Sequence, residues 1–171
     1  MWGVPLSLAR MPADTRFGIF AVGMNHPGEI TPLSRLVEPF AALITTVEAV
    51  HMAFFDSVEQ IADAKGEIFD GLQKGGVAIL NRDNPHFERL LAKAKASGAG
   101  RIISFGEHAD AEARLDKVAL NEDCPCVSAT ICGQPGTYKL TLTRRHIAIN
   151  CHCSPYVLPD AALVLRVHRP T

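Results

Sequence analysis

The sequence predicts an α/β fold in which helices flank a parallel sheet and a small antiparallel sheet follows near the C-terminus. Across the first two thirds of the 171 residues, short apolar runs alternate with segments of helical length. This alternation is typical of parallel strands joined by crossover helices. From about Arg114 the pattern changes to short strand-like runs separated by tight turns. Hydrophobic residues make up 47% of the chain and charged residues 20%, which excludes extended disorder.

Four strands are predicted in the parallel part. The first, Phe17–Gly23, is a continuous apolar run that ends in glycine, and such a run is typical of a strand buried on both faces. The second is rich in β-branched residues, and the other two are short apolar runs. These three strands are Ala41–Val47, Gly76–Leu80 and Arg101–Phe105.

Three helices are predicted between these strands. A short helix covers Glu29–Val37 after a polar loop. The strongest signal spans Ser57–Leu72, because its first serine and the glutamine three residues later form a capping box. In the third helix Asn84 is the expected N-cap, Pro85 takes the first helical position, and Gly98 marks the end.

After Arg114 the chain predicts an antiparallel sheet of short strands. The strands are Val118–Leu120, Val127–Cys132 and Tyr138–Leu142, with a turn at Gln134–Gly136 between the last two. The expected division of the chain is an α/β unit over residues 1–113, the antiparallel sheet of the same domain over 114–150, and a divergent tail over 151–171.

Charge and cysteine usage favour a cytoplasmic protein. The formal net charge is −1 and no basic face is interleaved with aromatic residues, so nucleic acid is not an expected partner. No apolar stretch reaches the length of a membrane span, and residues 1–11 lack the sustained apolar core of a signal peptide. Five cysteines without an export signal indicate a reducing compartment rather than a disulfide framework.

The cysteines do not predict a zinc site. Cys124 and Cys126 form one pair, and Cys151 and Cys153 flank His152. One residue separates the members of each pair, whereas structural zinc sites usually separate them by two to four residues. Ordinary strand cysteines are therefore favoured. The glycine-rich phosphate-binding motifs and the G-x-S-x-G motif are also absent from the sequence.

Polar residues follow several predicted strands. They are Asn25, His26, His51, Asn81 and Asp83. Because ligands of open parallel sheets bind at the carboxyl ends of the strands, these residues predict a polar site there. Any one of them alone is better explained as an ordinary loop residue, since strand-to-helix loops are usually polar.

Lys65 is unusual because it lies within the apolar stripe of the predicted helix Ser57–Leu72. Such a lysine either extends its ammonium to the rim along an apolar stem or is retained for its chemistry. The residues taken alone favour the first explanation.

Several motifs, in order and with matching spacing, resemble the central domain of the Mur ligases. They are Gly3–Leu8 (GVPLSL), Gly23–Ile30 (GMNHPGEI), Val50–His51, Ala62–Phe69 (ADAKGEIF) and Leu80–Asp83 (LNRD). The second and fourth motifs are similar to the MurF type, the ligases that add D-alanyl-D-alanine to UDP-muramoyl tripeptide. The resemblance covers about Gly3 to Asn150. It implies an ATP- and Mg²⁺-dependent ligase of peptidoglycan precursor synthesis that works through an acyl phosphate.

The resemblance also implies a metal site. His51 matches a metal-binding histidine of the family, and Lys65 matches a catalytic lysine that family members carbamylate and that then helps to hold Mg²⁺. This match favours a chemical role for Lys65. The sequence departs from the family at Ala21, where a glutamate ligand is usual, and at Ala53, where an acidic residue is common.

A nucleotide site is implied by two further matches. Asn81 and Asp83 match an element that contacts adenine and ribose, and Arg145 and His146 match an element near the nucleotide. The phosphate loop of the family would precede Gly3, and we expect the chain to lack it. Without that loop the β- and γ-phosphates lose their main binding site.

The tail after Asn150 does not resemble the family, and a shift of reading frame near this residue is the expected cause. The predicted protein is therefore a truncated MurF-like ligase, inactive unless a second chain supplies the phosphate loop and the outer domains. Two alternatives stay open. One is a residual adenine-nucleotide-binding or interaction module, and the other is a decaying gene fragment without a role.

Overall fold

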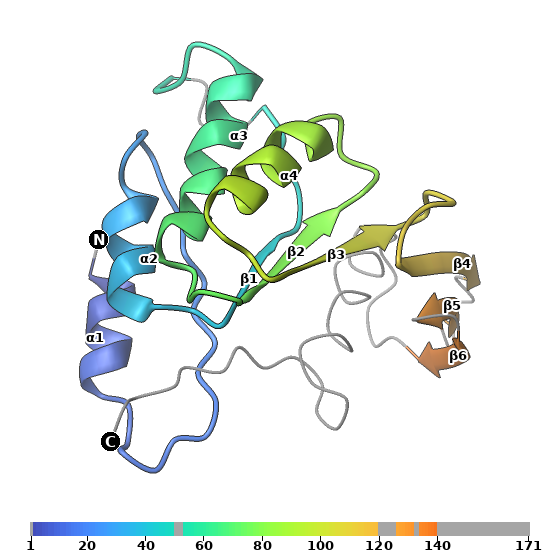
Figure 1. Cartoon of the computed structure of the whole chain (residues 1–171), viewed down its shortest axis with the longest axis horizontal. Coiled ribbons are helices and arrows are strands. Elements are labelled where there is room, and N and C mark those ends of the chain that lie inside the picture. The colour runs from blue at the N-terminus through green and yellow to red at the C-terminus, as the bar shows by residue number, and fades with distance from the viewer. Residues whose placement is uncertain (1, 50–52, 120–125, 132–133, 140–171) are drawn as a thin grey trace.

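The computed structural model describes residues 2–49, 53–119, 126–131 and 134–139. These residues form a six-stranded sheet with its strands in sequence order (Figure 1). The strands are β1 (Ala41–Ile44), β2 (Val77–Asn81), β3 (Arg101–Gly106), β4 (Ala113–Ala119), β5 (Cys126–Ile131) and β6 (Gln134–Lys139). The helices are α1 (Gly3–Ala9), α2 (Ile30–Val37), α3 (Val58–Gly66) and α4 (Phe87–Ala96), with the 3₁₀ helix η1 (Glu67–Gly71) directly after α3.

The first three strands are parallel, which confirms the predicted fold class. Helices α3 and α4 lie together beside β1 and β2 (Figure 1). Alternate strand residues face these helices and join a core cluster with them: Ala42, Ile44, Ala78 and Leu80. The intervening positions form a second cluster on the opposite face of the sheet, made of Ile79, Ile103, Phe105 and Ala113. Both faces of β1 and β2 are therefore buried, which explains why their sequences are continuous apolar runs.

Three strands with antiparallel pairing overlap the predicted strands and continue the parallel sheet; residues 120, 132 and 140–142 of the predicted strands lie outside the described residues. Strand β4 pairs in parallel with β3 at two positions and then pairs antiparallel with β5, which pairs antiparallel with β6. The predicted turn at Gln134–Gly136 is wrong, because these residues lie in β6 and Pro135 pairs with Thr130. A proline has no N–H to donate, and β6 is the last strand of the described sheet, where one side needs no partner.

The predicted strand Phe17–Gly23 does not form, since none of the described residues pairs with it in a ladder. The side chains of this segment nevertheless alternate between solvent and the protein interior, as they do in a strand. Ile19 is 50% exposed, whereas Phe20 and Val22 pack against the buried residues of α1 and α2. Its sequence favours an extended backbone, but a strand also needs a neighbour that supplies hydrogen bonds.

The helix predicted over Ser57–Leu72 is present but changes type. Its capping box is confirmed in part: Ser57 Oγ accepts the N–H of Gln60, while the Gln60 side chain accepts the N–H of Asp56 rather than that of Ser57. After Gly66 the chain continues as the 3₁₀ helix η1. The change occurs where η1 packs against α2, and the Ser34 hydroxyl donates to the carbonyl of Ile68 there.

Two helix boundaries differ from the prediction. Helix α4 begins at Phe87 rather than at Pro85, because Asn84 forms a tight turn in which its Oδ1 accepts the N–H of His86 at 2.9 Å. Helix α1 is not anticipated by the sequence, since no side chain caps its start at Trp2. Within the described ranges, no helix is long and apolar enough to cross a membrane.

Candidate functional site

Asn81 and Asp83 lie together at the carboxyl end of β2, as predicted. The Asn81 side chain is buried and uses both ends of its amide: Nδ2 donates to the carbonyl of Thr45 at 2.9 Å, and Oδ1 accepts the N–H of Asp83 at 2.9 Å. Thr45 directly follows β1. The last residue of β2 therefore joins the ends of two neighbouring strands, which accounts for a buried polar side chain at this position.

The Asp83 carboxylate extends the same network to β3. Its two oxygens accept the backbone N–H groups of Glu107 at 2.7 Å and His108 at 2.8 Å. These residues directly follow Gly106, the last residue of β3, which has φ +144°. Together with Asn81, this carboxylate connects the ends of β1, β2 and β3. We call the set Asn81, Asp83 and Gly106–His108 the strand-end rim.

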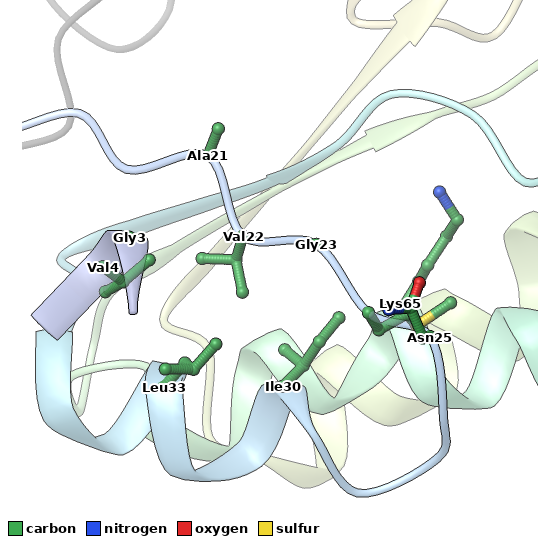
Figure 2. Close-up of a pocket in the computed structure, with 10 residues that line it drawn as sticks. Gly3, Val4, Ala21, Val22, Gly23, Asn25, Ile30, Leu33 and Lys65 are labelled. Carbon is green, nitrogen blue, oxygen red and sulfur yellow. The ribbon is translucent and has the colours of Figure 1, made fainter. Parts of the chain in front are cut away.

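A pocket of about 500 Å³ lies between the segment that follows Ile19 and the helices α1, α2 and α3 (Figure 2). Its polar end is formed by Asn25 and Lys65, and Gly3 and Val4 lie toward the other end (Figure 2). The other lining residues are Ala21, Val22, Gly23, Met24, Ile30 and Leu33. The pocket therefore brings Lys65 and Asn25 together, but Asn81 and Asp83 are not among its lining residues.

Lys65 is half-buried at the end of α3. Burial lowers the pKa of its ammonium below the usual 10.5, and the negative charge of Glu48, just beyond β1, partly offsets the shift. Both explanations of this lysine therefore find support. Its side chain lines a pocket whose other lining residues, apart from Asn25, are apolar or glycines, and in this environment the neutral amine is favoured relative to water.

We predict that Lys65→Met stabilises the fold and removes a pH dependence. The folded-state pKa is lowered, so between that value and 10.5 the unfolded chain binds the proton more strongly, and the free energy of unfolding rises with pH across this window. The variant should show a higher melting temperature at neutral pH and a smaller rise up to pH 10. Lys74→Met, at an exposed lysine, is the control and should change neither. An unchanged pH profile in Lys65→Met would contradict the burial of this ammonium.

The loop that precedes α2 is held by two carboxylates. Glu29 accepts the backbone N–H groups of Asn25 and His26, and these hydrogen bonds lower the pKa of Glu29. His26, which the sequence predicts to lie in the polar site, does not line the pocket, and its ring packs against the Phe54 ring with centroids 4.6 Å apart.

The sequence does not predict a role for Glu67, although this residue lies in the motif around Lys65. Glu67 caps α2 from a distance in the sequence. Its carboxylate accepts the backbone N–H groups of Gly28 at 2.6 Å, Ile30 at 3.1 Å and Thr31 at 3.1 Å. The N–H groups of Ile30 and Thr31 are donors that the start of a helix leaves without internal partners, and Gly28 belongs to the loop just before it. Because Glu67 follows Lys65 by two residues, the same contact fixes the end of α3 against the loop that lines the pocket.

The pocket as described does not fit Mg²⁺. This ion prefers oxygen ligands, carboxylates above all, whereas the pocket lining offers one amide side chain, a lysine and apolar or glycine residues. Ala21 has no donor atom, and no cluster of three or more acidic, histidine or cysteine side chains occurs among the described residues. His51, Arg145 and His146 lie outside the described residues, and so do Cys124, Cys132, Cys151 and Cys153.

Comparison with known protein families assigns the chain to a family. Residues 1–158 match the Mur ligase middle domain. The chain belongs to the Mur ligase family. Among curated relatives, the UDP-N-acetylmuramoyl-tripeptide–D-alanyl-D-alanine ligase of Rickettsia prowazekii is 40% identical over 113 residues, which is 66% of this chain and 25% of the relative.

Solved structures of Mur ligases share the fold. The MurF of Acinetobacter baumannii superposes with a TM-score of 0.80 at 24% identity over 88% of this chain and 32% of that one. The MurF ligase of Thermotoga maritima, solved in complex with ADP, superposes with a TM-score of 0.67 at 21% identity over 81% of this chain and 32% of that one. The chain therefore spans about a quarter to a third of the length of these relatives.

Proposed function

We propose that this Mur ligase domain supplies the adenine-nucleotide site of a MurF-type ligase, which adds D-alanyl-D-alanine to UDP-N-acetylmuramoyl tripeptide with ATP. The observation that supports it best is the strand-end rim, in which the matched residues Asn81 and Asp83 lie together at the carboxyl end of a parallel sheet. Ligands of open α/β sheets bind at that edge. We place the adenine and ribose of the nucleotide there, with Arg145 and His146 contributing from the later part of the domain.

We further propose that Lys65 reacts with CO₂ to form a carbamate. The ammonium first releases one proton to solvent. The lone pair of the neutral amine then adds to the carbon of CO₂, a C=O π bond of CO₂ opens onto its oxygen as the N–C bond forms, and the nitrogen releases a second proton, so that the cationic side chain becomes an anion. The burial that lowers the pKa of Lys65 supports this step, since only the neutral amine is nucleophilic. The carbamate would supply the anionic oxygens that the pocket lining lacks, and His51 is the second residue that we propose as a metal ligand, by family match.

By itself the chain is proposed to be inactive as a ligase. It spans a quarter of the length of the Rickettsia prowazekii relative, and the pocket beside Lys65 is lined largely by apolar residues and glycines. An acyl-phosphate route requires ATP phosphates and a muramoyl peptide held in fixed geometry. We therefore propose that ligase activity in the cytoplasm requires, besides this domain, the regions of a MurF-type ligase that hold the ATP phosphates and the muramoyl peptide.

A ligase assay tests this proposal. The purified chain is mixed with ATP, Mg²⁺, UDP-muramoyl tripeptide and D-alanyl-D-alanine, alone and after co-expression with the remaining segments of the Rickettsia prowazekii ligase. We expect ATP-dependent product only from the co-expressed pair, loss of product with Lys65→Ala, and retention with the exposed-lysine control Lys74→Ala. Product from the chain alone would contradict the claim of inactivity, and no product from the pair would contradict the ligase assignment.

A further inference from the structure

The Asp83 carboxylate is already engaged by its own protein. Each of its oxygens accepts one backbone N–H, from the consecutive residues Glu107 and His108. Hydrogen bonds from backbone N–H groups to a charged acceptor are among the stronger ones in proteins, and two on one carboxylate fix the direction of the chain that donates them. The residues after β3 are thus held against the end of β2.

The residue before these donors is shaped for the same contact. A Cβ placed on Gly106 would lie 2.5 Å from Asp83 Oδ2, and φ +144° at Gly106 is a conformation that residues with a side chain rarely adopt. The carboxylate therefore packs directly on the backbone of Gly106. Asp83 is in turn fixed through its own N–H, which donates to Asn81 Oδ1.

We propose that Asp83 is a positioning residue for the nucleotide. It holds the loop Gly106–His108 as one wall of the nucleotide site, and its effect on binding passes through that loop rather than through a contact with the ribose. This inference rests on the proposed function, which places the nucleotide at the strand-end rim. Because the loop is ordered before binding, nucleotide binding does not carry the entropic cost of ordering its backbone.

Two variants break the contact from opposite sides. Asp83→Asn replaces one acceptor oxygen by an NH₂ group that faces a backbone N–H, and Gly106→Ala introduces a Cβ where the carboxylate lies while Asp83 itself is retained. Both should weaken ADP binding about tenfold, the change that about 1.4 kcal/mol produces. Glu88→Gln alters an exposed carboxylate that pairs with Arg82, and this control should leave the affinity unchanged.

The experiment measures the affinity of wild type and variants for ADP and for 2′,3′-dideoxy-ADP, together with amide hydrogen exchange of Glu107 and His108 without ligand. We expect Asp83→Asn to weaken both nucleotides by the same factor and to speed exchange at both amides. Loss of ADP affinity with unchanged affinity for the dideoxy analogue would show a direct ribose contact and overturn the inference. Unchanged exchange at both amides would overturn it as well.

Failure of the proposed function gives a different result. If the wild-type chain binds neither nucleotide, the nucleotide site itself is wrong, and the positioning role is overturned with it. If the wild type binds both nucleotides and Asp83→Asn weakens the binding of ADP alone, the proposed function stands and Asp83 contacts the ribose directly. Gly106→Ala tests the same distinction a second time. If Asp83 contacts the ribose directly, this variant should also lose affinity for ADP but not for the dideoxy analogue.

Discussion

Gly71→Ala is expected to lower the free energy of unfolding by about 3 kcal/mol or more, a loss that is large for a single substitution. Gly71 ends η1, where it crosses α2, and a Cβ at this position would overlap the backbone carbonyl of Ser34. The obstacle is the backbone of α2 at the buried residue Ser34 rather than the tip of a flexible side chain, so relief requires the two helices to separate. Urea unfolding followed by circular dichroism measures the loss.

Gly3→Ala is the matched control for this substitution. Gly3 begins α1, and no atom lies within 4 Å of the position that its Cβ would occupy. Alanine is a better helix former than glycine, by up to about 1 kcal/mol inside a helix, so this control should be neutral or slightly stabilising. Equal urea midpoints for Gly71→Ala and wild type would show that α2 and η1 are not packed as closely as the structure has them.

Glu67→Ala is expected to have the second largest effect, a loss of about 3 kcal/mol, because it leaves three backbone N–H groups without their charged acceptor. The three donors belong to Gly28, Ile30 and Thr31 at the start of α2, where the helix dipole also favours a negative charge. Amide exchange of these residues should speed up more than that of α4. Glu67→Gln retains one acceptor oxygen and should fall between the alanine variant and wild type.

The control for Glu67 is Glu88→Ala. Glu88 pairs with Arg82 at an exposed position, and exposed ion pairs contribute little, so its loss should stay within about 0.5 kcal/mol. Equal losses for the two glutamates would mean that Glu67 does not cap α2.

Much of the fold follows from local sequence, and the exceptions have a common cause. Strands β1, β2 and β3 lie where apolar runs predict them, and in β1 and β2 both faces are buried. Phe17–Gly23 has an equally strong local signal and forms no ladder. Hydrogen-bonded pairing depends on a neighbouring strand, and a residue pattern within one segment carries no information about it.

The change from α3 to η1 and the position of Pro135 are also set by distant contacts. The first occurs where η1 meets Ser34 on α2, and the second depends on β6 being the last strand of the described sheet. A turn signal such as Gln134-Pro135-Gly136 does not distinguish a turn from an edge strand unless the neighbours are known.

The sequence motifs predict which residues form the candidate site, but not which groups their side chains contact. The match placed Asn81 and Asp83 together, and the structure adds that their polar atoms bind the backbone beyond β1 and β3. Glu67 lies within a motif, but the sequence predicts no role for it, because the N–H groups that its carboxylate accepts lie more than thirty residues earlier in the chain. Side-chain capping across such a distance leaves no periodic signal in the sequence.

NMR titration with ADP tests whether an adenine nucleotide binds at the strand-end rim. Amide resonances of the ¹⁵N-labelled chain are followed as ADP is added to millimolar concentration. We predict saturable shifts concentrated at Asn81–Asn84 and Gly106–His108, with little change in β5 and β6. Absence of saturable shifts, or shifts confined to residues away from the ends of β1, β2 and β3, would contradict the account.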